Sequence, residues 1–209
     1  HQYSLSSWLP KNEDDKKKHW VVPIATDRVP SDDKPNEFGM SQLTGMIENL
    51  ELTDELVVSV SDSAYGSENC RKEAEKLDNF VHIFRLQGNR NIFHKPIAPK
   101  YKQKKYGHKM SLGDSTTYCE HDEEKTTEYK SSKGKLFEVK VYRWNDLILR
   151  GSRDFKGHTH PLDLLKVEMR EVKENGAFGE VIGKPMWLVA YGKRRREIST
   201  LDIYRDYAQ

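Results

Sequence analysis

A strand–helix–strand pattern of about thirty residues limits most strongly how this chain can fold. Residues 56–61 (LVVSVS) are apolar and β-branched, which is typical of a short buried strand. Gly66 and Ser67 then open a predicted helix that runs to Leu77, and residues 79–86 (NFVHIFRL) form a second predicted strand. A connection of this length is what parallel strand pairing requires. We therefore predict an α/β fold that contains a parallel strand pair.

The rest of the chain predicts a core interrupted by a β-rich insertion. Apolar residues three and four apart indicate helices, and alternating ones indicate strands. We expect residues 1–18 to be irregular and residues 88–113 to form a long basic loop. The other predicted elements are a strand over residues 19–25, a helix over 37–49 capped by Asn36, a β-rich block over 126–172, turns over 173–183, a strand over 185–191 and a helix over 198–209 capped by Ser199 or Thr200.

Length and composition agree with one soluble domain that carries a large insertion. The chain has 209 residues, and its 7 Phe, 10 Tyr and 4 Trp are enough to anchor a core although 33% of the residues are charged. No apolar run approaches the roughly 18 residues of a membrane helix, so we expect no membrane association. Two cysteines make no disulfide framework, which favours a reducing cytoplasm. Because the chain opens on His1 without a methionine, we expect an internal fragment.

Charge is distributed unevenly along the chain. Residues 1–80 hold 9 Lys and Arg against 16 Asp and Glu, whereas residues 81–209 hold 26 against 17. Residues 79–113 contain eight bases, several aromatic residues and no acid. Such a stretch suits a polyanion, because Lys and Arg displace counterions from phosphates. A solvated basic loop without a ligand is the alternative.

Asp62 is the sharpest candidate for a functional residue. It follows the strand over residues 56–61 and precedes the predicted helix. The carboxyl ends of strands are where ligands bind in open α/β sheets, and a carboxylate there suits a hard divalent cation. The alternative is that Asp62 only caps the structure that follows it.

The stretch around Asp62 also resembles part of a known family. The residues concerned are Asp62-x-x-Tyr65-Gly66 after a β-branched strand, then Phe84-Arg85 and Gly88-Asn89-Arg90-Asn91. They resemble the middle of a bacterial insertion-sequence transposase of the DDE type, a cut-and-paste enzyme. Weaker similarity covers residues 1–4, 137–151, 187–192 and 201–207. The resemblance implies an incomplete ribonuclease H-like core over residues 1–92, a basic loop and β-rich insertion over 93–183, and the last core strand with the start of the catalytic helix over 184–209.

In that family three carboxylates bind two Mg²⁺ or Mn²⁺ ions, which promote DNA cleavage and strand transfer at transposon ends. The resemblance implies that Asp62 is the second of these catalytic, metal-binding carboxylates. Tyr207 matches the tyrosine of the family's Tyr-x2-Arg-x3-Glu signature, whose Arg and Glu have no match here. Asp27 is a poor match for the first Asp, which we expect upstream of His1. With one of three ligands, this chain alone is expected to have little activity.

The implied partners are transposon ends, target DNA and a second copy of the chain in a synaptic homodimer, in the bacterial nucleoid. Residues expected to contact DNA are Arg85, Asn89, Arg90, Lys100, Lys102, Lys104, Lys105, Lys109, Trp144, Arg150 and Tyr207. Arg90 has the alternative of pairing with a surface acid, and Trp144 that of packing in the core. Residues 193–196 (KRRR) suit a phosphate clamp or a solvated turn equally.

Other readings of the sequence are weaker. Cys119-x-His121 and His158-x-His160 lack the paired spacing of zinc sites, and residues 120–124 (EHDEE) are more typical of an acidic loop than of a cation site. The main competing hypothesis is a non-catalytic nucleic-acid-binding domain, in which Asp62 is only a cap and the basic stretch carries the function.

Overall fold

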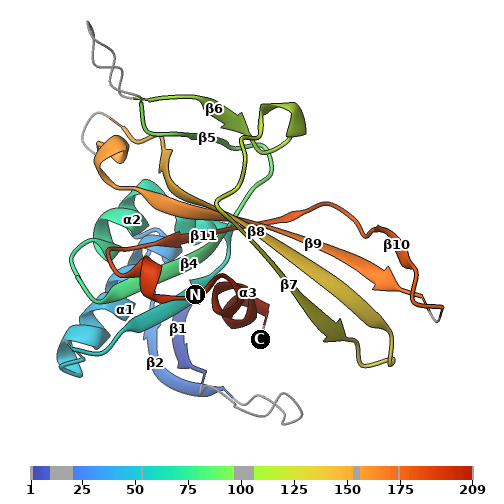
Figure 1. The fold of residues 1–209 in the computed structure, drawn as a ribbon. Coiled ribbons are helices and arrows are strands. Elements are labelled where there is room, and N and C mark those ends of the chain that lie inside the picture. The colour runs from blue at the N-terminus through green and yellow to red at the C-terminus, as the bar shows by residue number, and fades with distance from the viewer. Residues whose placement is uncertain are drawn as a thin grey trace, which may run out of the picture.

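The protein is a mixed α/β molecule with one large mixed sheet and few helices (Figure 1). The computed structural model describes residues 2–9, 21–52, 54–96, 106–152, 156–173 and 175–208. Nine strands form the sheet in the order β3-β4-β11-β9-β8-β5-β6, with β10 paired to β9 and β7 to β8. Strands β1 and β2 form a separate antiparallel pair.

The strand–helix–strand prediction is confirmed. Strand β3 (Val57–Ser61) and strand β4 (Phe80–Leu86) pair in parallel, with Val60 opposite Ile83. Between them lie a 3₁₀ helix (Ser63–Gly66) and helix α2 (Glu68–Ala74). The hydroxyl of Ser67 accepts a 3.3 Å hydrogen bond from the backbone N–H of Cys70, which caps α2. All other strand pairs of the sheet are antiparallel.

Helix α1 (Pro35–Asn49) forms where it is predicted, but Asn36 does not cap it. The capping position is Lys34, and Pro35 occupies the first turn, where its missing N–H costs nothing. The side-chain amide of Asn36 instead donates a 2.8 Å hydrogen bond to the carbonyl oxygen of Ala64. Asn36 therefore ties α1 to the turn that follows Asp62.

The first residues of the chain differ from the prediction of an irregular segment. Strand β1 (Tyr3–Trp8) pairs with strand β2 (Val22–Arg28). Ser4 is buried on this pair, and its hydroxyl donates a 2.6 Å hydrogen bond to Gln42 of α1. The serines of β1 are polar, so the segment lacks the apolar alternation that predicts a strand. The strand depends instead on its pairing with β2 and on its contact with α1.

The predicted β-rich block and last strand are confirmed as long antiparallel strands. They are β7 (Glu123–Lys130), β8 (Leu136–Leu149), β9 (Leu162–Val172) and β11 (Met186–Tyr191). Three short strands lie where loops or turns are predicted, namely β5 (Asn91–Phe93), β6 (Lys109–Ser111) and β10 (Phe178–Val181). Strand β11 pairs with β4 and β9, so strands from all three predicted segments join one sheet.

The sheet buries a core on each face. On one face α1 and α2 cover a cluster that includes Phe84, Trp144 and Trp187. On the other, helix α3 (Thr200–Ala208) covers Ile83 and Leu188. The predicted cap of α3 is confirmed at Ser199, whose hydroxyl accepts a 3.1 Å hydrogen bond from the N–H of Asp202. Among the described helices, none combines the length and apolar character needed to cross a membrane.

Candidate nucleic-acid interface

A hollow of about 400 Å³ opens at the carboxyl ends of β3 and β4. It brings together three residues that the sequence predicts as functional: Asp62, Arg85 and Tyr207. Lys184, which the sequence analysis did not single out, also lines it. The other lining residues are Ser63, Leu86, Gln87, Gly88, Pro185 and Trp187.

The parallel pairing explains why Asp62 and Arg85 meet. Ser61 lies opposite Phe84, so the next residues, Asp62 just after β3 and Arg85 near the end of β4, lie at the same edge of the sheet. Val60 and Ile83, two positions earlier, pack in the core on the α3 face. Because side chains alternate along a strand, Asp62 and Arg85 also project to the α3 face. Tyr207, near the end of α3, lies on the same side of the sheet.

Asp62 acts as a cap in this structure, as its alternative reading proposed. Its Oδ1 accepts a 2.8 Å hydrogen bond from the backbone N–H of Ala64 and so caps the 3₁₀ helix. The residue is exposed, and within the described part of the chain Oδ2 accepts no hydrogen bond. One carboxylate oxygen therefore remains open to the hollow while the other holds the turn.

Some basic residues in and near the hollow have no carboxylate partner within the part of the chain that the structure describes. Ion pairs between described residues join several other arginines to Asp or Glu: Arg143, Arg170, Arg194, Arg195, Arg196 and Arg205. Among the described residues, no carboxylate lies within ion-pair distance of Arg85, Arg90 or Arg150. Within the described ranges, Arg90 thus has no surface acid as a partner, which was its alternative. These guanidinium groups are available to an external anion.

The described residues do not make a metal site on their own. Asp62 is the only carboxylate among the described residues lining the hollow, and Arg85 and Lys184 add positive charge beside it. A search of that same part of the structure finds no group of three or more His, Cys, Asp or Glu suited to a metal ion. Asp27 lies on β2 and accepts a 2.7 Å hydrogen bond from Gln42. The expected Mg²⁺ or Mn²⁺ therefore stays a prediction.

The other predicted DNA contacts are dispersed. Asn89 and Arg90 are exposed in the turn after β4, and Lys109 is exposed on β6. The guanidinium of Arg150 lies over the rings of Phe93 and Tyr106. The predicted contacts Lys100, Lys102, Lys104 and Lys105 lie outside the described residues.

Trp144 is a core residue and not an exposed stacking residue. Only 3% of it is exposed, and its ring centroid lies 6.0 Å from that of Trp187. Its indole N–H donates a 2.9 Å hydrogen bond to the carbonyl oxygen of Cys119. The expected stacking of Trp144 on DNA is therefore corrected: alternation along β8 turns the ring into the core on the α1 and α2 face.

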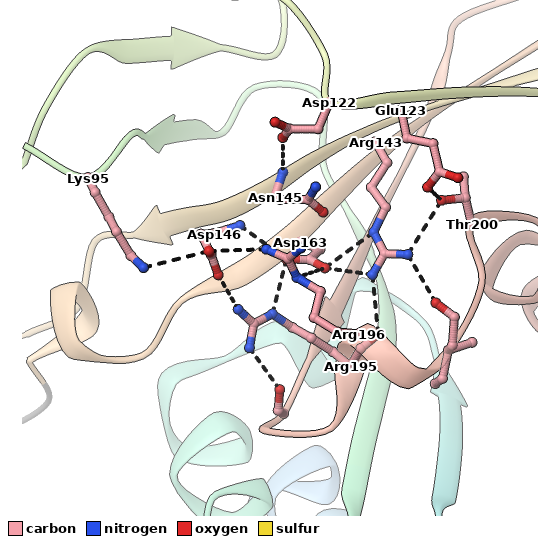
Figure 2. Close-up of polar contacts among 12 residues, drawn as sticks. Lys95, Asp122, Glu123, Arg143, Asn145, Asp146, Asp163, Arg195, Arg196 and Thr200 are labelled. Carbon is pink, nitrogen blue, oxygen red and sulfur yellow. Dashed lines mark hydrogen bonds and ion pairs between the residues drawn. The ribbon is translucent and has the colours of Figure 1, made fainter.

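All four cations of the run at residues 193–196, predicted as a phosphate clamp or a solvated turn, pair with carboxylates of the protein. Figure 2 shows that two of its arginines join an ion cluster around Asp163, whose side chain is fully buried. Arg143 of β8 binds the same carboxylate at 2.6 Å, and Arg195 and Arg196 bind it at 3.0 and 3.1 Å. The remaining two residues of the run pair with Asp78 and Glu197. Asp163 and Asp146 together face Arg143, Arg195, Arg196 and Lys95, so the pairing leaves this cluster with a net positive charge.

The same cluster fixes the start of α3. One Arg143 nitrogen donates a 3.0 Å hydrogen bond to the carbonyl of Ile198, and the other donates at 3.2 Å to that of Arg195. Asp146 closes the exposed side of the cluster. Burial acts to raise the pKa of Asp146, but Arg196, Lys95 and Arg195 outweigh this effect and hold the pKa below its usual value.

The histidine pairs do not form the weak zinc sites considered from the sequence. His121 lies 3.4 Å from Glu124, and His160 lies 3.1 Å from Glu75. Cys119 is half-buried with a free thiol. Within the described ranges these residues build no cluster of metal ligands.

Comparison with models of known protein families gives no match, and neither curated proteins nor solved structures match the chain significantly. The site must therefore be interpreted from its own geometry. Lys184 lies between β10 and β11. It comes to lie beside Arg85 because β10 pairs with β9 and β11 pairs with β4. No pattern in the neighbouring sequence predicts that Lys184 lies beside Arg85.

Proposed function

We propose that this chain is part of the catalytic domain of a DDE-type transposase, with an incomplete ribonuclease H-like core and a β-rich insertion. Its substrates would be transposon ends and target DNA, and a homodimer would bring two ends together in the bacterial nucleoid. The reaction class would be metal-dependent DNA cleavage and strand transfer. The observation that carries the proposal is the meeting of Asp62, Arg85 and Tyr207 in one hollow.

Charge and position support DNA as the ligand of the hollow. Arg85 and Lys184 are exposed cations without carboxylate partners among the described residues, and together they outnumber the single charge of Asp62. Phosphates bind such cations by releasing counterions. Asp62 lies at the ligand-binding edge of a parallel pair, where one of its oxygens is open. A metal site there needs carboxylates beyond those that line the hollow.

A non-catalytic nucleic-acid-binding domain is the second candidate. The observation that favours it is the 2.8 Å hydrogen bond by which Asp62 caps the 3₁₀ helix. A structural cap needs no metal, and the basic residues would then bind DNA without cleaving it.

Two substitutions at Asp62 separate these functions. Asp62→Asn keeps a side-chain oxygen for the cap but loses the charge, whereas Asp62→Ala loses both. We expect Asp62→Ala, but not Asp62→Asn, to lower the unfolding free energy by about 1 kcal/mol in urea titrations. With DNA bound, millimolar Mn²⁺ should broaden the amide NMR signals of residues 61–65 in the unmodified chain and spare them in Asp62→Asn. Equal broadening in both would leave Asp62 as a cap and favour the second candidate.

The DNA partner is tested through salt dependence. Arg85→Ala and Lys184→Ala should each reduce the slope of log affinity against log salt concentration by about 0.9 in fluorescence anisotropy titrations with duplex DNA. Lys193→Ala is the control, because Lys193 is exposed but paired with Asp78. If neither substitution changes the slope relative to this control, the hollow does not bind DNA.

A further inference from the structure

The guanidinium of Arg150, an exposed residue, lies over two aromatic rings. Its guanidinium carbon lies 5.7 Å from the ring centroid of Phe93 and 5.5 Å from that of Tyr106. The two rings contact each other, with centroids 5.1 Å apart. Across the described residues no acid pairs with Arg150. The rings therefore orient the guanidinium while its hydrogen-bond donors stay free.

Arg170 provides a direct contrast. Its guanidinium also lies over an aromatic ring, 4.1 Å from the centroid of Phe178. Arg170 is however paired with Glu138 at 2.5 Å. Stacking on a ring is therefore common to both arginines, and the absence of a carboxylate distinguishes Arg150.

The surroundings of Arg150 form a basic face, which we call the Arg150 face: Phe93, Tyr106, Lys109 and Arg150. Lys109 of β6 lies directly opposite Phe93 of β5, and Arg150 follows Leu149, which lies opposite Ile92. Ile92, Met110 and Leu149 point into the core on the α1 and α2 face. Alternation directs Phe93, Lys109 and Arg150 away from this core.

A short turn connects the hollow with the Arg150 face. Gln87 and Gly88 line the hollow, and β5 begins at Asn91. Arg90 lies in this turn, and its N–H donates a 3.1 Å hydrogen bond to the carbonyl of Gln87. The segment from residue 79 to 113 contains no acid, but Asp114 follows it and lies close enough to Lys109 for the ammonium group to help lower the pKa of Asp114. Along the chain, Arg90 thus lies between Arg85 of the hollow and Phe93 of the Arg150 face.

We propose that the Arg150 face binds the phosphodiester backbone of DNA that extends from the hollow, with Arg150 and Lys109 as the phosphate contacts. This inference rests on the proposed function, because it takes DNA as the ligand of the hollow. Phe93 and Tyr106 act as positioning residues, since a guanidinium that already lies over two rings loses less conformational freedom on binding. DNA contacts then continue past the reacting end along the β4–β5 turn.

The test compares Arg150→Ala with Arg170→Ala in the full chain, by anisotropy of labelled duplex DNA between 50 and 300 mM KCl (roughly the range in which phosphate contacts are salt-sensitive). Arg150→Ala should reduce the salt slope by about 0.9 and weaken binding about eightfold at 0.1 M salt. Arg170→Ala should match the unmodified chain. Arg150→Lys keeps the charge and should restore most of the slope. Thermal unfolding monitors that each variant is folded.

Two results would overturn the inference in different ways. If Arg85→Ala and Lys184→Ala lower the slope but Arg150→Ala behaves as Arg170→Ala does, DNA binds the hollow and not the Arg150 face. If the unmodified chain shows no salt-dependent DNA binding, the proposed function fails together with the inference. A substitution of Phe93 by Leu that weakens binding without changing the slope would support the positioning role, because the number of phosphate contacts is then unchanged.

Discussion

His82 shows how one residue can make the stability of this protein depend on pH. The imidazole lies on β4 between Phe80 and Phe84 and is 1% exposed. Its Nδ1 lies 2.7 Å from the hydroxyl of Ser59, and its Nε2 lies 3.3 Å from that of Ser61. Burial disfavours the charged imidazolium and lowers the pKa of His82 to about 4.

We expect acid to destabilise the protein through His82. The unfolded chain has an ordinary histidine pKa near 6.5, so between that pH and about 4 it binds the proton that folded His82 refuses. Stability from this residue is complete above pH 6.5 and should fall by about 3 kcal/mol as the pH drops to 4. Urea titrations across this range should show the loss, and His82→Gln should flatten it. An equally steep loss in His82→Gln would assign the effect to other groups.

Residue-level prediction succeeded where a local pattern also fixed the direction of a side chain. Asp62 follows β3 and Arg85 lies near the end of β4, and because these strands are parallel both residues lie at the same edge of the sheet. Trp144 could not be assigned in this way, because its burial depends on Trp187, which lies 43 residues further along the sequence. Lys184 was missed for the same reason: its place beside Arg85 depends on strand pairing between distant segments.

At the scale of elements, the Asp163 cluster joins β8 and β9 to the connection between β11 and α3. Asp163 lies on β9, Arg143 on β8, and Arg195 and Arg196 in the connection. The segment with the KRRR run resembles a ligand-binding turn in the sequence, since Asp146 and Asp163, which pair with Arg195 and Arg196, lie far away along the chain. A run of basic residues in a sequence can therefore indicate an internal ion cluster as well as an anion-binding site.

Asp163→Asn should strongly destabilise the protein. It removes the only charge that Arg143 and Arg195 share in the interior, and breaking one partner of a buried ion pair costs about 3–5 kcal/mol. Urea unfolding measures this loss, and amide hydrogen exchange should rise first in α3, whose start the cluster fixes. Lys193→Ala, which removes an exposed pair, should leave both measurements unchanged. A loss of stability without faster exchange in α3 would argue against the positioning of that helix.

Elements were predicted well where their own residues carry the pattern. Strands β3, β4, β8, β9 and β11 and helices α1 and α2 follow apolar periodicity and agree with the prediction. The short strands β5 and β6 do not, because three residues contain too little periodicity and depend on the exposed edge of β8 for pairing. Strand β1, whose Ser4 binds α1, is a similar case.

At the scale of the whole molecule, β11 is the strand on which the sheet depends. It lies between β4 and β9, which belong to the first and second predicted segments, and pairs with both along its whole length. Its residues are buried on both faces, with Trp187 in one core and Leu188 in the other. The three predicted segments are therefore expected to unfold together and not as separate units.

Removal of residues 184–209 tests this cooperativity. Without β11, strands β4 and β9 each lose a partner, both cores open, and α3 is lost with its cover over Ile83. We expect the shortened chain to show no cooperative unfolding transition by circular dichroism and poor dispersion of its amide NMR signals. Replacing residues 178–181 with Ser and Gly is the matched control, because β10 pairs only with β9 and exposes Phe178 and Val181. That control should unfold cooperatively, with circular dichroism and tryptophan fluorescence giving the same midpoint. The physical reason for this expectation is that a sheet cut at its middle strand leaves too little buried apolar surface to stabilise either half. A cooperative transition in the shortened chain would contradict it and show that residues 1–183 have a core of their own.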